Sequence, residues 1–326
     1  MKALVTGASG FTGGYMVKNL LQHGYQVRAL VRSTSRIDHL KDLPIDWVYG
    51  KLESADDLLR AAEGVDVIYH IAALYRAANV PDSIYEQVNV GGTRHVLEAA
   101  RAQGVKRVIH CSTGGVHGHV QNPPGDEDSP FHPGDIYQSS KLAGEQLAMD
   151  YHREHGLPVT VVRPIGIYGP GDTRMLKMYR LIKKGRFVMF AGGRALYHLT
   201  FVADTVEGFR LAGESEKAVG QAYLIAGEEY VTLSEFAALI AEVLGVGKPW
   251  LKLPVWPLYG AAWLCEGICV PLRIQPPIYR RRVDIFVKDR AFSIEKAKRD
   301  LGYYPQVGLR EGITRTAAWY TGEGLL

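Results

Sequence analysis

Near the start of the chain, Lys2-Ala3-Leu4-Val5-Thr6 runs directly into Gly7-Ala8-Ser9-Gly10-Phe11-Thr12-Gly13. The first five residues form the apolar run of a buried strand, and the glycines after them let the backbone turn tightly. A helix expected over 13–22 would point its free N–H groups and the positive end of its dipole at this turn. A turn of this kind brings backbone close to a diphosphate, so we expect the glycine turn to bind a dinucleotide. The predicted cofactor residues of the turn are Gly7, Gly10, Phe11, Thr12 and Gly13.

Strand and helix signals alternate through the first two-thirds of the chain. We expect strands at 2–6, 26–31, 47–49, 67–71, 107–112 and 159–163, and helices at 13–22, 55–62, 83–103 and 137–155. This alternation is typical of βαβ units and of a parallel sheet covered by helices on both faces. The sequence therefore predicts an α/β fold: a Rossmann-type, doubly wound parallel sheet with a smaller, interleaved C-terminal substrate domain.

The regular alternation of strand and helix signals ends after about residue 170. Helices are expected at 173–184 and 232–244, and a stretch rich in Pro and Trp follows at 249–277. We assign residues 1–170 to the dinucleotide-binding domain, to which 197–226 returns because 199–211 has the pattern of a strand and a helix. Residues 171–196 and 227–326 are predicted to form mainly the substrate-binding domain.

Composition excludes several classes of protein. The chain has 326 residues, 47 % apolar and 22 % charged, which is ordinary for a soluble globular protein. The net charge is +4 and the Lys and Arg residues are mostly scattered, which disfavours nucleic-acid binding. The odd cysteine count, three, suits a reducing cytoplasm, and because Cys265 and Cys269 have no further ligands nearby, no metal site is expected.

Neither a secretory signal nor a membrane-spanning helix is expected. The chain enters its first strand directly after Met1. The most apolar segment, 253–272, contains three prolines and Glu266, which a spanning helix would tolerate poorly. Two interpretations of this segment remain, an apolar helix of the soluble fold and a contact with the membrane surface.

The end of the second strand bears on the choice of cofactor. An acidic residue at this place accepts from the ribose 2′-hydroxyl of NAD, whereas an arginine accommodates the 2′-phosphate of NADP. Here Arg32 follows the strand, and Asp38 is the first carboxylate after it. The pattern favours NADP over NAD, although a solvated basic loop would look the same.

Tyr137 and Lys141 form the candidate catalytic pair. Their spacing places both side chains on one face of the helix expected at 137–155. A nearby ammonium favours the phenolate, so Tyr137 can exchange a proton with a hydroxyl while hydride moves to or from a nicotinamide. Ser112 and Thr113 add hydroxyls at the carboxyl end of the fifth strand, the edge where ligands of such sheets bind.

Several segments, in this order, resemble the extended short-chain dehydrogenase/reductase family over nearly the whole chain. This family includes NAD-dependent epimerases and dehydratases and a branch similar to 3β-hydroxysteroid dehydrogenase. The matching segments are the Gly7–Gly13 turn, Asp66–Ala73, Asn89–Thr93, Ser112-Thr113, the Tyr137/Lys141 pair, Arg163–Asp172 and Leu301–Pro305.

The resemblance implies roles for individual residues. Thr113 would hydrogen-bond the substrate oxygen for Tyr137, and Lys141 would also hold the nicotinamide ribose. The further cofactor-site residues implied are Leu52, Ala72, Ala73, Asn89 and Pro164. One departure is Lys51, which stands where the family often has an Asp that accepts from the adenine amino group; a lysine can only donate.

Three functions remain open. An apolar stretch at 249–277 resembles the steroid-dehydrogenase-like branch and favours hydride transfer at a secondary alcohol or ketone of an apolar substrate, such as a 3β-hydroxysteroid or 3-oxoalkanoate. The alternative is a nucleotide-sugar 4-epimerase or dehydratase that retains NAD, in which Arg281 would bind diphosphate. Tyr197 weakens that alternative, because it stands where such epimerases usually carry an Arg. A lesser alternative is a non-catalytic protein that senses NADP on the same fold.

The predicted substrate residues are Ser112, Tyr197, His198 and Arg281. His198 has a second interpretation, as a structural histidine of the core. The resemblance also implies a homodimer formed through the helices expected at 83–103 and 137–155.

Overall fold

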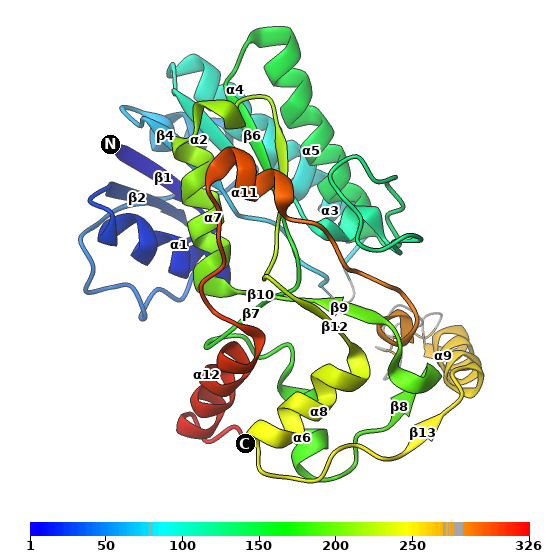
Figure 1. Cartoon of the computed structure of the whole chain (residues 1–326). Coiled ribbons are helices and arrows are strands. Elements are labelled where there is room, and N and C mark those ends of the chain that lie inside the picture. Colours follow the sequence, from blue (N-terminus) through cyan, green and yellow to red (C-terminus); the bar gives the residue numbers. More distant parts are fainter. Residues whose placement is uncertain (78–79, 270–271, 273, 275, 277–282) are drawn as a thin grey trace.

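The computed structural model describes residues 1–77, 80–269, 272, 274, 276 and 283–326. Within these residues the largest sheet has seven strands, ordered β11-β6-β5-β4-β1-β2-β3, and every neighbouring pair is parallel (Figure 1). Its strands are β1 (Lys2–Thr6), β2 (Gln26–Val31), β3 (Ile45–Tyr49), β4 (Val67–His70), β5 (Arg107–Cys111), β6 (Val159–Pro164) and β11 (Ala222–Ile225). The predicted doubly wound parallel sheet is confirmed.

Helices cover both faces of this sheet, as its near-continuous apolar strands require. One face is covered by α1 (Phe11–Gln22), α7 (Val202–Glu214) and α11 (Glu295–Leu301). The other is covered by α2 (Ala55–Ala62), α4 (Gly92–Ala102) and α5 (Ile136–His155). Helix α11 comes from the C-terminal part of the chain and lies on β11 and α7. The chain therefore returns to the sheet after it has formed α8 and α9.

The long helix expected at 83–103 is interrupted in the structure. It consists of α3 (Asp82–Tyr85), a π-helical segment η1 (Glu86–Gly91) and then α4. A π-helical turn holds an extra residue and rotates the side chains after it. Asn89 lies within this segment and is only 1 % exposed.

The remaining elements form a second core below the carboxyl edge of the sheet (Figure 1). Its helices are α6 (Leu176–Lys183), α8 (Leu233–Val243) and α12 (Leu309–Gly322), and α9 (Trp256–Cys269) lies at its outer side. The short strands of this region are β7 (Ile167–Tyr168), β8 (Met189–Phe190), β9 (Leu196–His198), β10 (Thr200–Phe201), β12 (Tyr230–Thr232) and β13 (Lys252–Leu253). The division into domains at the predicted boundaries stays a prediction.

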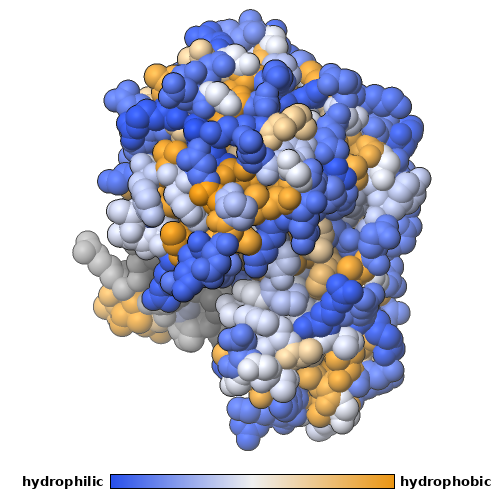
Figure 2. All heavy atoms as spheres, turned by 90° about the vertical axis from the view of Figure 1, so that its left-hand side faces the viewer, coloured by the Kyte–Doolittle hydropathy of each residue, from blue (hydrophilic) through white to orange (hydrophobic). Residues whose placement is uncertain are grey.

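The surface is largely polar on the side of the sheet where α1 and β3 lie. Figure 2 shows this side, where hydrophilic side chains predominate and hydrophobic ones gather in separate patches. Among the described helices, none is both long and apolar enough to cross a membrane.

Candidate active site

The carboxyl edge of the sheet gathers most of the predicted site residues. Because β1, β4, β5 and β6 are parallel, the segments that follow them leave the sheet on the same side. The glycine turn follows β1, Ala72 and Ala73 follow β4, and Ser112 and Thr113 follow β5. Pro164 is the last residue of β6.

The glycine turn is closed by contacts that leave no room for side chains. Gly7 has φ +77°, and a Cβ there would lie 2.8 Å from the backbone of Ala72. A Cβ on Gly13 would lie 2.0 Å from the carbonyl oxygen of Gly7. Gly10 begins α1 without a side-chain cap, so the N–H groups of the first helical turn are not taken by a capping side chain. The turn thus has the features of a diphosphate cradle, and it brings two predicted cofactor residues, Gly7 and Ala72, together.

Helix α5 presents the candidate catalytic pair. The carboxylate of Asp135 accepts from the backbone N–H of Gln138 at 2.9 Å and starts the helix one residue before Tyr137. Tyr137 is half-buried, and Lys141, one turn on, is only 2 % exposed. Burial lowers the pKa of Lys141, while the neighbouring Cys111 and Glu145 raise it. Glu145 is itself bound by the Nε of Arg163 at 3.0 Å.

Three side chains that the sequence did not single out surround Tyr137. The ring of Tyr75 meets the ring of Tyr137 edge-on at 4.9 Å between centroids, and the guanidinium carbon of Arg76 lies 5.7 Å from each ring centroid. Arg174 lies with its guanidinium carbon 5.6 Å from the Tyr75 ring centroid. Burial raises the pKa of Tyr137, and the charges of Arg76 and Arg174 act in the opposite direction. The only signal in the sequence was that Tyr75 and Arg76 follow closely after the Asp66–Ala73 segment.

The two hydroxyls after β5 differ in their surroundings. The Oγ1 of Thr113 accepts from the backbone N–H of Gly115 at 3.1 Å, so its own proton is left to donate. The Oγ of Ser112 is buried and has no hydrogen-bond partner in the described part of the chain. His117, four residues after Thr113, is buried, and its Nδ1 lies 2.9 Å from the carbonyl oxygen of Ser129.

A network of buried hydrogen bonds links the ends of β1 and β4 with the segment that contains Asn89. The Nδ1 of His70 lies 2.8 Å from the Oγ1 of Thr6, and its Nε2 lies 3.1 Å from the Oγ1 of Thr93. Because Thr93 donates its own proton to the carbonyl oxygen of Asn89 at 2.7 Å, it accepts from the Nε2–H of His70. This fixes the tautomer of His70, whose pKa burial lowers to about 3.

Asn89 extends this hydrogen-bond network to α5. Its Oδ1 accepts from the N–H of Leu74 at 2.7 Å, and its Nδ2 donates to the carbonyl oxygen of Leu74 and to the Oγ of Ser140. Ser140 in turn donates to the carbonyl oxygen of Tyr137 at 2.9 Å. Asn89 therefore connects the segment after β4 with the turn of α5 that carries Tyr137.

The predicted adenosine-side residues lie at the end of β2 and near β3. Arg32 is exposed directly after β2. Leu52 is half-buried and leaves so little space at Gly92 that a Cβ there would lie 3.0 Å from the Leu52 Cβ. The backbone N–H of Lys51 donates to the carboxylate of Asp57 at 2.9 Å.

Tyr197 and His198, two of the predicted substrate residues, have different neighbours. Tyr197 is half-buried and stacks on Phe236 at 5.9 Å between ring centroids. His198 is 3 % exposed, with its Nε2 2.8 Å from the carbonyl oxygen of Gly227 and its Nδ1 accepting from the N–H of Phe292. Both nitrogens are thus engaged by backbone, which favours the structural interpretation of His198. Arg281 lies outside the described residues.

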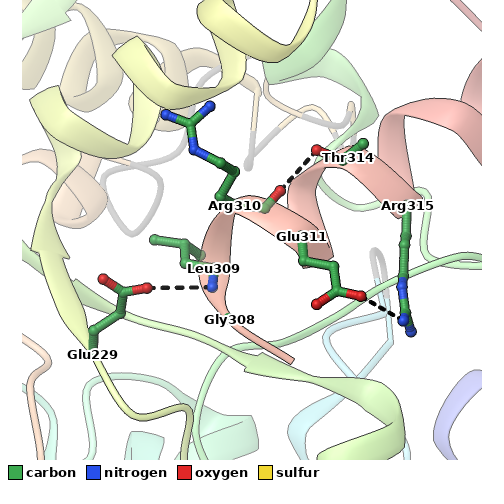
Figure 3. Close-up of a pocket in the computed structure, with 7 residues that line it drawn as sticks. All are labelled: Glu229, Gly308, Leu309, Arg310, Glu311, Thr314 and Arg315. Carbon is green, nitrogen blue, oxygen red and sulfur yellow. Dashed lines mark hydrogen bonds and ion pairs between the residues drawn. The ribbon is translucent and has the colours of Figure 1, made fainter. Parts of the chain in front are cut away.

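A cavity of about 550 Å³ lies elsewhere, at the start of α12 (Figure 3). Its carboxylates and guanidiniums are partnered. Glu229 accepts from the N–H of Leu309 at 3.3 Å, Glu311 pairs with Arg315 at 2.6 Å, and Arg310 pairs with Glu242 at 3.0 Å. Since none of the predicted site residues lines it, this cavity is separate from the candidate active site.

No cluster of metal-binding side chains is found in the described part of the chain.

Comparisons with known proteins identify the family of the chain. The model of the NAD dependent epimerase/dehydratase family matches residues 3–226. The chain is 31 % identical to a 3 beta-hydroxysteroid dehydrogenase/Delta 5-->4-isomerase of Mycobacterium tuberculosis, over 98 % of this chain and 90 % of that protein. It is 29 % identical to the 2-alkyl-3-oxoalkanoate reductase of Stenotrophomonas maltophilia, over 98 % and 99 % of the two chains. It also resembles the solved dTDP-glucose 4,6-dehydratase of Streptomyces venezuelae, with a TM-score of 0.80, 27 % identity and 100 % of both chains covered.

Proposed function

We propose, because this chain belongs to the NAD dependent epimerase/dehydratase family, that it transfers hydride between a nicotinamide cofactor and a secondary alcohol or ketone of an apolar substrate. The resemblance to the extended short-chain dehydrogenases/reductases is confirmed, and the chain is an oxidoreductase of that type. The observation that carries the proposal is the pairing of Tyr137 with buried Lys141 at the sheet edge where the glycine turn lies.

The residues at this edge fit a dinucleotide. The diphosphate would lie on the uncapped start of α1, over Gly7, Gly10 and Gly13. The other cofactor residues in this proposal are Phe11, Thr12, Leu52, Ala72, Ala73, Asn89, Tyr137, Lys141 and Pro164. When bound, the nicotinamide supplies or accepts the hydride.

Tyr137 would move the proton. Its raised pKa keeps the phenol neutral at physiological pH, which is the form that donates a proton to a carbonyl oxygen during reduction. Thr113, whose proton is available, would hydrogen-bond the same oxygen, and the unpartnered Oγ of Ser112 would assist. In the direction of oxidation, a positively charged nicotinamide would bring the pKa of Tyr137 down.

We propose NADP as the preferred cofactor. The support is Arg32, exposed at the end of β2 where no carboxylate precedes Asp38. An arginine there would bind the 2′-phosphate, whereas an acidic residue would repel it.

An apolar substrate is favoured over a nucleotide sugar. Two relatives carry names that describe oxidoreductases of a steroid and of an alkyl oxo acid. The dTDP-glucose dehydratase structure supports the alternative, but Tyr197 takes the place of the Arg expected for diphosphate. A non-catalytic NADP sensor is disfavoured because Tyr137, Lys141 and Thr113 are all present.

The test of this choice is the nucleotide that the purified protein carries. The protein is denatured and the released nicotinamide nucleotides are quantified by chromatography. An exchanging oxidoreductase releases little nucleotide, whereas an epimerase returns hydride to the same substrate and can retain NAD through every turnover. Near-stoichiometric NAD would therefore overturn the proposed exchange and favour the nucleotide-sugar enzyme.

Helix α9 supports a contact with the membrane surface. Its outward face carries Trp256, Trp263, Leu264 and Ile268, and Trp256 and Trp263 are 73 % and 67 % exposed. These positions share one face of the helix. The sequence from 244 to 283 has six basic residues and one acidic residue, Glu266, so the rest of the chain has a net charge of −1. Exposed tryptophans within a stretch of sequence that carries net positive charge fit an anionic lipid surface, and we propose that surface as the partner of α9.

Vesicle co-sedimentation tests this contact. The full chain should bind vesicles rich in phosphatidylglycerol more strongly than pure phosphatidylcholine vesicles, and Trp263→Ser with Leu264→Ser should lose the binding. Two results would contradict a lipid partner. One is that the chain fails to bind anionic vesicles, and the other is that the double variant changes only from dimer to monomer. A homodimer through the α4 and α5 region stays a prediction, checked by light scattering.

A further inference from the structure

Positive charge is concentrated beside the candidate acid. The guanidinium carbon of Arg76 lies 5.7 Å from the ring centroid of Tyr137, and Arg174 approaches the same group of rings through Tyr75. An apolar alcohol or ketone needs only the hydroxyls and Tyr137 to bind its reacting oxygen, so these guanidiniums are free to bind another part of the substrate.

The two arginines are only partly neutralised. Arg76 uses its Nε for Asp135 at 2.8 Å, and its terminal Nη groups bond to none of the described residues. Arg174 is held by both carboxylate oxygens of Asp172 and by the carbonyl oxygen of Ile167. Each guanidinium therefore has a fixed orientation, and Arg76 retains donors that can bind another acceptor.

A third arginine reaches this region from the C-terminal part of the chain. Arg290 forms a backbone bridge with Tyr197 on β9. Its Nε is buried, and its guanidinium makes no hydrogen bond or ion pair with any described residue. Burial raises the pKa of Tyr197 to about 12, and the charges of Arg290 and Arg76 act against this rise. A buried cationic donor without a partner is costly unless a ligand completes it.

We propose that Arg76 and Arg290, supported by Arg174, form an anion site that binds a carboxylate of the substrate close to its reacting carbon. This proposal rests on the proposed function and narrows it to 3-hydroxy or 3-oxo carboxylates with an apolar remainder. In oxidation, hydride leaves the carbinol carbon for the nicotinamide and the hydroxyl proton passes to Tyr137, while the carboxylate stays unchanged. Arg76 adjoins Tyr137 itself, whereas in a nucleotide sugar the whole pyranose ring separates carbon 4 from the diphosphate.

The experiment compares a charged substrate with its neutral counterpart. The probes are a 2-alkyl-3-hydroxy fatty acid and its methyl ester, each with NADP, and kcat/KM is measured for both. The wild type should prefer the acid, and Arg290→Gln should lower the acid-to-ester ratio by about tenfold to a hundredfold, as expected for losing one charge-assisted hydrogen bond. Arg290→Lys should restore part of the ratio. Arg194→Gln removes an exposed arginine of the adjoining loop and should leave the ratio unchanged.

Other results would overturn the carboxylate site or assign the arginines to a different anion. Equal kcat/KM for acid and ester in the wild type, or an equal loss for both in Arg290→Gln, overturns the carboxylate site. If Arg290→Gln instead weakens NADP binding in a fluorescence titration, the anion is the cofactor's phosphate, and the substrate assignment is wrong. Competition by dTDP or UDP would assign the arginines to a nucleotide diphosphate. If the wild type oxidises neither probe nor a 3β-hydroxysteroid, the proposed function itself fails.

Discussion

The side-chain amide of Asn89 donates to the Oγ of Ser140 across 2.9 Å, and Ser140 donates onward to the carbonyl oxygen of Tyr137. The bond joins a π-helical segment to α5, three residues after Tyr137. It ties the position of the candidate acid to the segment that follows β4, because the same Asn89 also holds both backbone groups of Leu74.

Removal of this amide should therefore loosen Tyr137. Asn89→Ala leaves the buried backbone groups of Leu74 and the Oγ of Ser140 without their partner, which should lower the free energy of unfolding by about 2 kcal/mol. The kcat should fall as well, because the turn that carries Tyr137 loses its support. Chemical denaturation and steady-state kinetics measure the two effects. Gln87→Ala, at an exposed position of the same π-helical segment, is the matched control and should change neither.

Tyr137→Phe tests the proton transfer. Loss of the phenol should lower kcat by about a hundredfold to ten-thousandfold, the range of general acid–base catalysis. Cofactor affinity, measured by fluorescence titration, should remain within a few fold of the wild type. Tyr151→Phe removes a phenol from the same helix, where it donates to Glu98 at 3.3 Å, and should leave kcat unchanged. Full turnover by Tyr137→Phe would show that another group moves the proton.

Arg76 should set the pH range of oxidation. Oxidation needs the Tyr137 phenolate, and the charge of Arg76 lowers the pKa of Tyr137. Arg76→Gln removes that charge, so the pKa rises and the alkaline increase of the oxidation rate should move to higher pH. The pH dependence of kcat with saturating cofactor measures this shift. A profile that is unchanged, or displaced to lower pH, would contradict the proximity of Arg76 to the reacting proton.

Two buried histidines should make the fold sensitive to mild acid. Burial lowers the pKa of both His70 and His110 below the ordinary value, which is about 6.5 in an unfolded chain. The unfolded state therefore binds more protons below that pH, and stability present above about pH 6.5 is lost as the pH falls.

The melting temperature across pH 7 to 5 measures this loss. His110 has no hydrogen-bond partner for either ring nitrogen among the described residues, so His110→Leu should make the melting temperature less dependent on pH. His132→Gln, at an exposed position, should leave the pH dependence as in the wild type. An equally steep loss of stability in His110→Leu would mean that His110 does not contribute.

Arg32 should decide between the two cofactors. Arg32→Glu replaces a partner of the 2′-phosphate by a carboxylate that repels it and can accept from the 2′-hydroxyl of NAD. The ratio of the dissociation constants for NADP and NAD should move toward NAD by about tenfold or more. Arg36→Glu, four residues on and also exposed, is the control for general charge effects. An equal effect of both variants would contradict a specific phosphate contact.

The parts that sequence predicted well depend on local pattern. The apolar runs and the glycine turn gave the parallel sheet, and the Tyr137/Lys141 spacing identified a pair on one face of α5. The interruption at Asn89 was missed because a π-helical turn leaves the amphipathic pattern of 83–103 nearly unchanged. The arginine group was missed for a different reason: Arg76, Arg174 and Arg290 are far apart in the sequence, and no spacing in the chain relates them.

In the proposed reaction, hydride passes between a substrate carbon and a cofactor that exchanges with solution. The most direct measurement uses a 3-hydroxy substrate deuterated at its carbinol carbon, together with free NADP. We predict that deuterated NADPH accumulates in solution in step with the 3-oxo product, and that Tyr137→Phe forms neither. If the deuterium is held only in a nucleotide that remains bound to the protein and then returns to the substrate, the chain does not act as an exchanging oxidoreductase.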